Sequence, residues 1–473
     1  MILRIMLMRI IRMRISNSAW LGVILLSGMP LWSQQDQTQQ NQNSVPAAAA
    51  SAPLLGGAVN SDDQGRMLTP PPVSGESYPL SFAEERSNYL RGGVTFNTAY
   101  SDNVLGATST TPISDVSYSV WPTLVFDETT SRLRMVLTYA PGFTFYQHTS
   151  GYNEADQNLS FDVRYRLSPH VTVSLRDSLQ KTSDIFNQPD QGLDLAVSGS
   201  AQAANQSVIA PLADRLSNSG NAGITYQFSA NAMIGASGTF TNLHYPNPAQ
   251  VPGLFDAASR GGSAFYSHRI SRQHYVGVTY QYQDLLSYPT SGTNETQTHS
   301  ALFFYTFYPA PTFSFSLFSG PQYYSSGPQF LGGAQSPLPA SQAWTPAAGA
   351  SLNWQARHTA MTFSYLHSVS SAGGLVGAVQ LDSANASAMR QLARNLSASF
   401  SGAYANDGVL ALSSLGGHSL SGSAAVQRQV GEHFKLQGGY TRLHQDYGFI
   451  LADPDTNREW VSISYQFVRP LGR

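Results

Sequence analysis

Apolar and polar residues alternate with a period of two over most of the chain, from about residue 93 to residue 468. In one such segment the odd positions are apolar and the even positions polar: Leu159, Phe161, Val163, Tyr165 and Leu167 against Ser160, Asp162, Arg164 and Arg166. Successive side chains of a β-strand point to opposite faces, whereas a helix would scatter these two sets around its circumference. The pattern therefore predicts an all-β chain whose strands each have one apolar and one polar side.

The connections between these segments alternate between short and long. Short turns are expected near 127–131, 168–170, 229–231, 271–273, 309–311, 357–358, 394–395 and 430–433. Longer polar connections are expected near 102–113, 147–155, 183–216, 244–260, 287–295, 326–344, 372–380, 407–416 and 447–456. This alternation is typical of transmembrane antiparallel β-barrels, which have short periplasmic turns and long extracellular loops. We therefore predict a barrel of about 18 strands, whose first strand (about 93–101) closes against the last (about 458–468).

Two segments are harder to interpret. Residues 301–320 carry no charge and are long enough for a membrane helix, but Pro309 and Pro311 in their middle favour a hairpin of two strands. Residues 372–400 are rich in Ala, Ser and Gly, and their alternation is faint. The strand that we place near 381–393 could equally be a short helix that ends at Arg394, which would change the strand count.

The N-terminal part has a different composition. Residues 1–33 combine a basic stretch with a short apolar run, which predicts an export signal peptide; an uncleaved anchor helix is the alternative. Residues 34–80 are rich in Gln, Asn, Ala and Pro and predict a disordered periplasmic lead-in. A capping-box pattern from Ser81 to Glu84 predicts a short linker helix over 81–92, for which a plug inside the barrel is the alternative. Residues 93–473 then form the barrel.

Composition supports a membrane location. Charged residues make up 11% of the chain and aromatic residues another 11%, yet only 42% of residues are hydrophobic. Few charges without a large apolar excess suit strands that face lipid on one side and water on the other. A soluble sandwich would instead need an apolar interior on the face that is polar here. These features favour the bacterial outer membrane.

Charge and chemistry exclude several functions. The net charge of −2 gives no basic face for nucleic acid, and the absence of cysteine excludes disulfides and Cys-ligated zinc. No catalytic motif, metal-ligand motif or cofactor-binding motif is found. We therefore expect a protein that is not an enzyme, with no cofactor, no catalytic residue and no metal site.

The chain resembles the outer-membrane β-barrel porins of Gram-negative bacteria in its export signal, its alternating hairpins and its final strand, Trp460–Phe467. The resemblance implies a barrel that the barrel-assembly machinery inserts by reading an aromatic residue near the C-terminus. The six residues after Phe467 depart from that pattern. Porin-like barrels are often homo-oligomers, and some similar large barrels accompany exopolysaccharide secretion.

If the apolar side faces lipid, the polar side lines a pore. The expected pore-lining residues are Arg132, Arg134, Asp162, Arg164, Arg166, Arg176, Gln281, Gln283, Gln355 and Gln437. The arginines would concentrate positive potential on one wall; the alternative is that they pair with carboxylates such as Asp162. We also expect the longest loop, 183–216, to narrow the pore with Asp184, Asp190, Asp194 and Asp214, or else to form an extracellular cap.

The sequence thus predicts a porin-like channel in contact with outer-membrane lipid, through which small hydrophilic solutes or oligosaccharides pass. Two other hypotheses remain open. One is the outer-membrane barrel of a polysaccharide export or secretion system, and the other is a barrel-embedded hydrolase.

Overall fold

The computed structural model describes residue 67 and residues 88–105, 112–183, 214–248, 253–310, 312–330, 337–371, 374–375, 377–410, 416–447 and 455–471. These residues form 18 strands and one short 3-10 helix, Ser150–Tyr152. The strands are β1 Tyr89–Ser101, β2 Asp115–Thr129, β3 Leu133–Tyr146, β4 Glu154–Arg166, β5 Val171–Thr182, β6 Arg215–Ser229, β7 Ala232–His244, β8 Asp256–Arg269, β9 His274–Tyr288, β10 Asn294–Ala310, β11 Phe313–Ser326, β12 Ser341–Gln355, β13 Thr359–Ser371, β14 Ala378–Ala393, β15 Leu396–Val409, β16 Gly416–Val430, β17 Phe434–Tyr447 and β18 Asp455–Pro470. Within these ranges, no helix is both long enough and apolar enough to cross a membrane.

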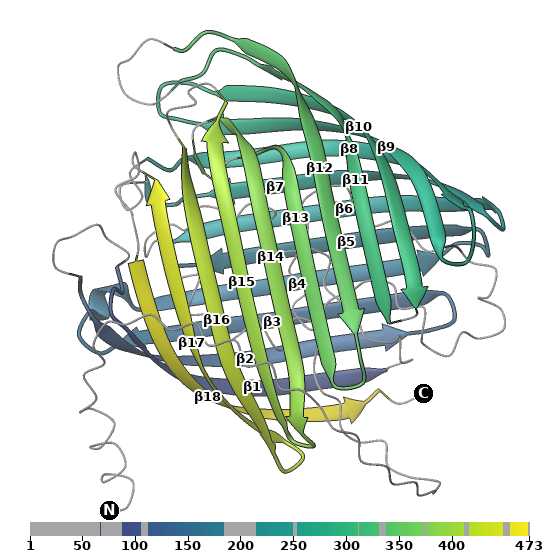
Figure 1. The fold of residues 1–473 in the computed structure, drawn as a ribbon. Coiled ribbons are helices and arrows are strands. Elements are labelled where there is room, and N and C mark those ends of the chain that lie inside the picture. Colours follow the sequence, from purple (N-terminus) through teal and green to yellow (C-terminus); the bar gives the residue numbers. More distant parts are fainter. Residues whose placement is uncertain are drawn as a thin grey trace, which may run out of the picture. The chain divides into compact units, whose positions relative to one another are not determined.

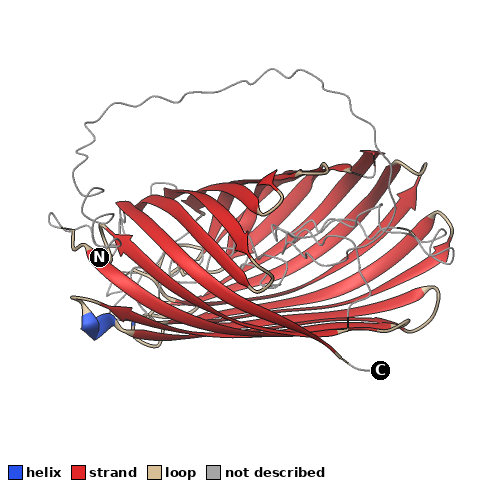
Figure 2. Cartoon of the chain, turned by 90° about the horizontal axis from the view of Figure 1, so that it is seen from below, coloured by secondary structure: helices blue, strands red, loops and turns tan. Residues whose placement is uncertain are grey.

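Each strand pairs antiparallel with its neighbours in sequence, and β1 also pairs with β18, so the sheet closes on itself (Figures 1 and 2). The closing register runs from Tyr89 opposite Pro470 to Ser101 opposite Arg458. A closed antiparallel barrel of 18 strands was predicted, and it is confirmed. Closure follows from the alternation: lipid offers no hydrogen bonds, so a membrane-spanning sheet must satisfy both of its edges.

Connections of two to four residues alternate around the barrel with connections of five to 32 residues. The hairpin predicted around Pro309 and Pro311 is present as β10 and β11. Residues 381–393 lie within β14, so the alternative of a short helix there is wrong. We refer below to the short-turn end and the long-loop end of the barrel; the assignment of these ends to periplasm and exterior stays a prediction.

The two sides of each strand differ as the alternation predicts. In β3, for example, Leu137, Tyr139 and Phe143 are exposed, whereas Thr138 and Thr144 are buried. Side chains of the buried parity meet across the lumen from strands that are not neighbours, so this parity faces inward. The exposed apolar parity faces outward.

One prediction for the N-terminal part needs correction, and one residue of the lead-in lies within the described part. Strand β1 begins at Tyr89, so residues 89–92 belong to the barrel and not to a helix; residues 81–87 lie outside the described part. The strand starts early because β18 continues to Pro470 and offers it a partner. Within the lead-in, Met67 is buried, and its backbone N–H donates a hydrogen bond to Gln227 Oε1 at 3.1 Å. At this residue the lead-in is packed against the barrel and not free in solvent.

Several aromatic rings lie over glycines of the neighbouring strand. A Cβ atom placed on Gly277 would come within 2.2 Å of Phe304, one on Gly235 within 2.4 Å of Phe265, and one on Gly349 within 2.4 Å of Phe318. These pairs face the lumen. A glycine weakens a strand, and a ring laid over it from the next strand restores packing and fixes the register.

The Gly277 pair gives a test of this packing. We expect Gly277→Val to lower the free energy of unfolding by about 1–3 kcal/mol, because its Cβ atom would meet both the Phe304 ring and the backbone carbonyl oxygen of Tyr266, each at 2.2 Å. The control is Gly422→Val, since a Cβ atom there has its nearest neighbour at 3.9 Å. The midpoints of urea unfolding, followed by heat-modifiable migration on gels, would be compared. Equal midpoints for the two variants would contradict this role of the ring.

Candidate functional site

The outer face of β12 shows how the barrel meets the membrane. Trp354 lies next to the short turn and Trp344 near the long loop, and the outward residues between them are Leu352, Ala350, Ala348 and Pro346. Ten residues at about 3.3 Å each, on a strand tilted by about 40°, span about 25 Å along the membrane normal. This is the height of the apolar band of transmembrane barrels.

Aromatic groups ring both ends of this band. At the short-turn end His274 stacks on Phe307 with ring centres 4.7 Å apart, and Phe434 contacts Tyr465. At the long-loop end Trp344 contacts Tyr323, and Tyr280 hydrogen-bonds His299. Amphipathic rings prefer the level of the lipid headgroups. A closed barrel with an apolar belt between two such girdles is an outer-membrane β-barrel.

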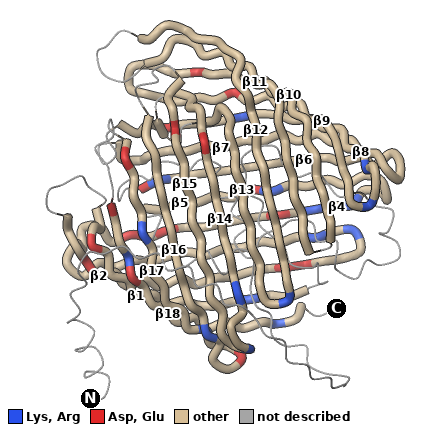
Figure 3. The backbone as a smooth tube through the Cα atoms, viewed as in Figure 1, with Lys and Arg blue, Asp and Glu red and all other residues tan. Residues whose placement is uncertain are grey.

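Charges are segregated along the barrel axis. Arg and Lys gather at the short-turn end, and Asp and Glu predominate at the long-loop end (Figure 3). The basic group that faces the lumen comes from strands β1, β3, β4, β8 and β17, and its members are Arg91, Arg134, Arg164, Arg166, Arg269 and Lys435. We call this group the basic wall. It is the candidate functional site.

The register brings the predicted arginines of the basic wall together. Arg134 on β3 lies directly opposite Arg164 on β4, and Arg166 follows two positions along the same face. Like charges directly opposite one another across a strand pair are destabilising. The register thus places three arginines together on the inner face, near the short-turn mouth of the barrel.

One ion pair adjoins the basic wall. Arg176 on β5 lies opposite Asp162 on β4 and donates hydrogen bonds to its Oδ2 from Nε at 2.9 Å and from Nη2 at 2.6 Å. Both side chains are about one-third exposed. The predicted alternative, pairing of an arginine with Asp162, therefore holds for Arg176.

The other predicted pore-lining residues do not join this group. Gln281 and Gln283 on β9 and Gln355 on β12 have the inward parity but belong to other parts of the wall. Gln437 on β17 is buried and hydrogen-bonds Gln427 and Ser462. Arg132 is a correction: it is exposed in the turn between β2 and β3, because β3 begins one residue later.

Most of the predicted acidic constriction lies outside the described residues, namely Asp184, Asp190 and Asp194. Asp214 accepts a hydrogen bond from Ser183 at 2.6 Å and lies 3.5 Å from Lys181 Nζ. Lys181 has the outward parity of β5, so this carboxylate is paired at the rim.

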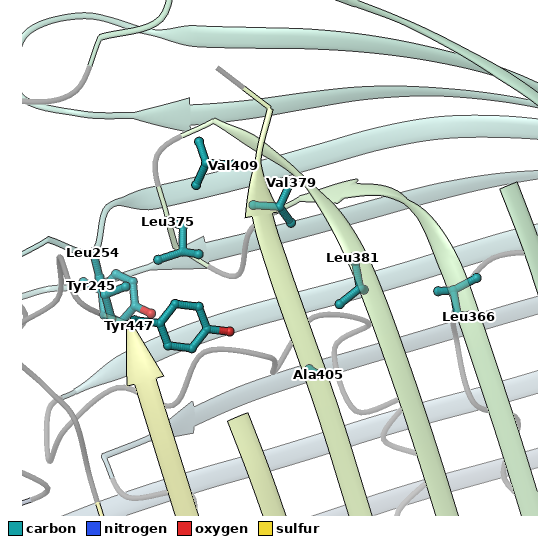
Figure 4. Close-up of a cluster of buried hydrophobic side chains, with 9 residues drawn as sticks. All are labelled: Tyr245, Leu254, Leu366, Leu375, Val379, Leu381, Ala405, Val409 and Tyr447. Atoms are coloured by element: carbon teal, nitrogen blue, oxygen red, sulfur yellow. The ribbon is translucent and has the colours of Figure 1, made fainter. Parts of the chain in front are cut away.

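The sequence did not predict an apolar cluster inside the lumen at the long-loop end. Its residues come from four strands, β13, β14, β15 and β17, and from two loops: Leu366, Val379, Leu381, Ala405, Val409, Tyr447, Tyr245, Leu254 and Leu375 (Figure 4). Leu375 and Val379 are completely buried. Burial also raises the pKa of Tyr245 to about 12, so its hydroxyl stays neutral. We call this cluster the lumenal plug.

One backbone hydrogen bond joins the two connections of the plug. The Phe255 N–H, in the β7–β8 connection, donates to the Gly374 carbonyl of the β13–β14 connection at 2.7 Å. Gly374 has a φ of 105°, which favours glycine, and a Cβ atom there would meet the Tyr245 hydroxyl at 2.9 Å. The residues that the structure describes inside the lumen at this end thus come in part from these two connections. A possible signal was the run of apolar residues among glycines between residues 373 and 379.

A second, smaller apolar cluster lies inside the short-turn end. Met67 of the lead-in packs there with Met233, Tyr275 and Tyr308. Within the described ranges no group of three or more His, Cys, Asp or Glu side chains is placed to hold a metal ion.

Comparison with solved structures gives distant similarities. OccK2 (OpdF) of Pseudomonas aeruginosa aligns at 8% identity and a TM-score of 0.40, covering 81% of this chain and 98% of that one. OccAB4 of Acinetobacter baumannii aligns at 10% identity and a TM-score of 0.39, covering 81% and 99%. The ferric-catecholate import receptor Fiu of E. coli K12 aligns at 8% identity and 0.42, covering 82% and 83%. Neither a protein-family model nor a curated protein matches the chain.

The basic wall can be tested by neutralising its opposed pair. We expect the double variant Arg134→Gln/Arg164→Gln to reduce the ratio of chloride to potassium permeability by roughly a factor of two or more, because the local positive potential falls. Reversal potentials in a KCl gradient across a planar bilayer measure this ratio. Arg260→Gln is the matched control, since Arg260 pairs with Asp284 on the outer face. An unchanged ratio in the double variant would remove the basic wall from the ion path.

Proposed function

We propose that this protein is an outer-membrane channel for small hydrophilic solutes, with a preference for anions. The observation that carries the proposal is the basic wall, in which Arg134, Arg164 and Arg166 face the lumen of a closed barrel whose inner surface is largely polar. Passage through such a channel needs no catalytic step. Selectivity would come from the width of the bore, its electric field and its hydrogen-bonding side chains.

The segregation of charge gives the channel a direction. An anion that enters from the short-turn end meets arginines at the mouth, whereas one that enters from the long-loop end first meets carboxylates (Figure 3). Such a field raises the local concentration of anions at the basic mouth and lowers it at the acidic one. The proposal therefore includes rectification of anion current along the barrel axis.

The lumenal plug would set the size limit of the channel. It is apolar and completely buried at Leu375 and Val379. The Phe255 N–H joins it to the β7–β8 connection through the Gly374 carbonyl, and the Gly377 N–H joins it to β9 through Ser287 Oγ. A packed apolar cluster excludes water, so solutes would pass beside it or during its displacement.

We expect Leu375→Asp to increase the single-channel conductance, because an unpaired charge at a fully buried position is costly and would expel the β13–β14 connection from the lumen. Planar-bilayer recordings would compare it with Ile113→Asp, at an exposed position next to β2. Conductance equal to that of the unmodified barrel, in a variant that still shows heat-modifiable folding, would mean that the plug does not limit flow.

The experiment for the function itself is the uptake of sized solutes by proteoliposomes. Swelling in isotonic solutions of small sugars and sugar acids should be faster than in protein-free vesicles, and faster for the acids than for neutral sugars of equal mass. Absence of any swelling would overturn the channel. In that case the export barrel, our second candidate, would be favoured by the contact of Met67 with the lumen, since a seated lead-in could transmit the binding of a periplasmic partner.

A further inference from the structure

The seam between β12 and β13 is hydrogen-bonded over only part of its length. Pairing joins Ala348–Gln355 of β12 to Ala360–His367 of β13. The remaining half of β12, Ser341–Ala347, pairs with β11 on one side and has no strand partner on the other. At the long-loop end, the backbone ladder of the wall is therefore interrupted at this seam.

The missing partner lies inside the lumen. Beyond His367, strand β13 turns inward, and the Val369 N–H donates a hydrogen bond at 2.9 Å to the side-chain oxygen of Gln322, which projects from the inner face of β11. Further along, the Gly377 N–H donates to Ser287 Oγ at the end of β9, at 3.0 Å. Residues that would cover the edge of β12 thus pack instead against the inner face of β11 and β9, on the same part of the wall.

The free half of β12 has the sequence of a protected edge. Pro346 lies directly opposite Pro321 of β11. Neither proline has an N–H, so the two cannot exchange hydrogen bonds, and the backbone of Pro346 must point away from β11 and into the seam. A proline on an edge removes a donor that an added strand would need. This edge is therefore unsuited to pairing with another chain.

The open seam reaches the apolar belt. Trp344, 70% exposed and 5.2 Å from the ring of Tyr323, marks the headgroup level at the long-loop end. Residues 345–347 come next along β12 and lie closer to the bilayer centre than Trp344. The lower part of the unpaired edge therefore borders the hydrocarbon tails of the adjacent leaflet, and its upper part borders their headgroups.

The inner side of the seam is apolar as well. Ala343, from the free half of β12, packs against a buried cluster formed by Leu285, Tyr324, Val369 and Ala378. Ala378 is followed by Val379, a member of the lumenal plug. Apolar side chains thus continue from the seam to the interior of the barrel.

We propose that the β12–β13 seam is a side entrance that admits single-chain amphiphiles from the long-loop leaflet to the lumenal plug. The alkyl tail would lie against Ala343 and the residues behind it, and the polar head would stay near Trp344. The seam lies between the hydrocarbon tails of the leaflet and the apolar cluster behind Ala343, and no ladder hydrogen bond has to be broken for a molecule to pass through it. An alkyl chain forms no hydrogen bonds, so it does not need to pair with the free backbone groups of β12. This entrance goes beyond the proposed passage of hydrophilic solutes and does not depend on it.

The test uses a fluorescent reporter in the lumen. The chain has no cysteine, so Ser383→Cys gives a unique site for a bimane label on the inner face of β14, next to the plug. The protein is placed in phosphatidylcholine nanodiscs, and 5-doxyl-stearate is added as the amphiphile that carries a quencher. We expect the emission at position 383 to fall at least twofold. This measurement requires no ion conduction, so it separates the entrance from the channel function.

Two controls distinguish entry through the seam from quenching through the wall. A label at Ser401→Cys, inward on β15 between fully paired neighbours, should lose little emission. In the 383-labelled protein, a series Ala343→Val, Leu and Phe should restore emission progressively as the seam is filled, whereas Ala403→Phe on β15 should not. Equal quenching at 383 and 401, or quenching that persists through the series, would overturn the side entrance. The graded series keeps the result interpretable if the largest substitution prevents folding.

Discussion

The architecture depends on one constraint: inside a bilayer every backbone N–H and C=O group must find a partner within the protein. A chain whose strands each have one apolar side can meet this only by closing the sheet, and here β1 meets β18 over their whole common length. Closure separates the apolar faces, which meet lipid, from the polar faces, which meet each other across a lumen. The basic wall exists because the same operation collects inward residues from strands distant in sequence, such as Arg91, Arg164 and Lys435.

The same constraint explains how the chain is arranged where the strand pairing between β12 and β13 is interrupted. Where β13 leaves the wall, its backbone does not go unpaired: Val369 bonds the side chain of Gln322, and Gly377 bonds Ser287. The abandoned edge of β12 is short, carries Pro346, and begins close to the headgroup level, where water can solvate it. An interruption deeper in the hydrocarbon would cost several kcal/mol for each unsatisfied group. The apolar plug and the unpaired edge are therefore two consequences of one inward turn of the chain.

Most of the fold could be predicted because alternation and turn spacing are local. The predicted turns near residues 168–170 and 394–395 coincide with the observed ones, and the Pro309–Pro311 hairpin is correct. β14 was ambiguous because a run of Ala and Ser gives little contrast between the two sides of a strand. The start of β1 at Tyr89 depends on a partner almost 400 residues away, which no local pattern contains. Parity placed Arg134 and Arg164 on one face, but only the register showed that they are directly opposite.

The lumenal plug could not be predicted for a different physical reason. Leu254 and Leu375 lie in connections that are otherwise polar or rich in glycine, and single apolar residues are common on protein surfaces. They become a cluster only because two connections from different parts of the wall meet across the bore, held by the bond from Phe255 to Gly374. Burial then removes water from the space between them, so each connection stabilises the other. A polar-lined barrel thus acquires its larger apolar cluster at the end opposite the basic mouth.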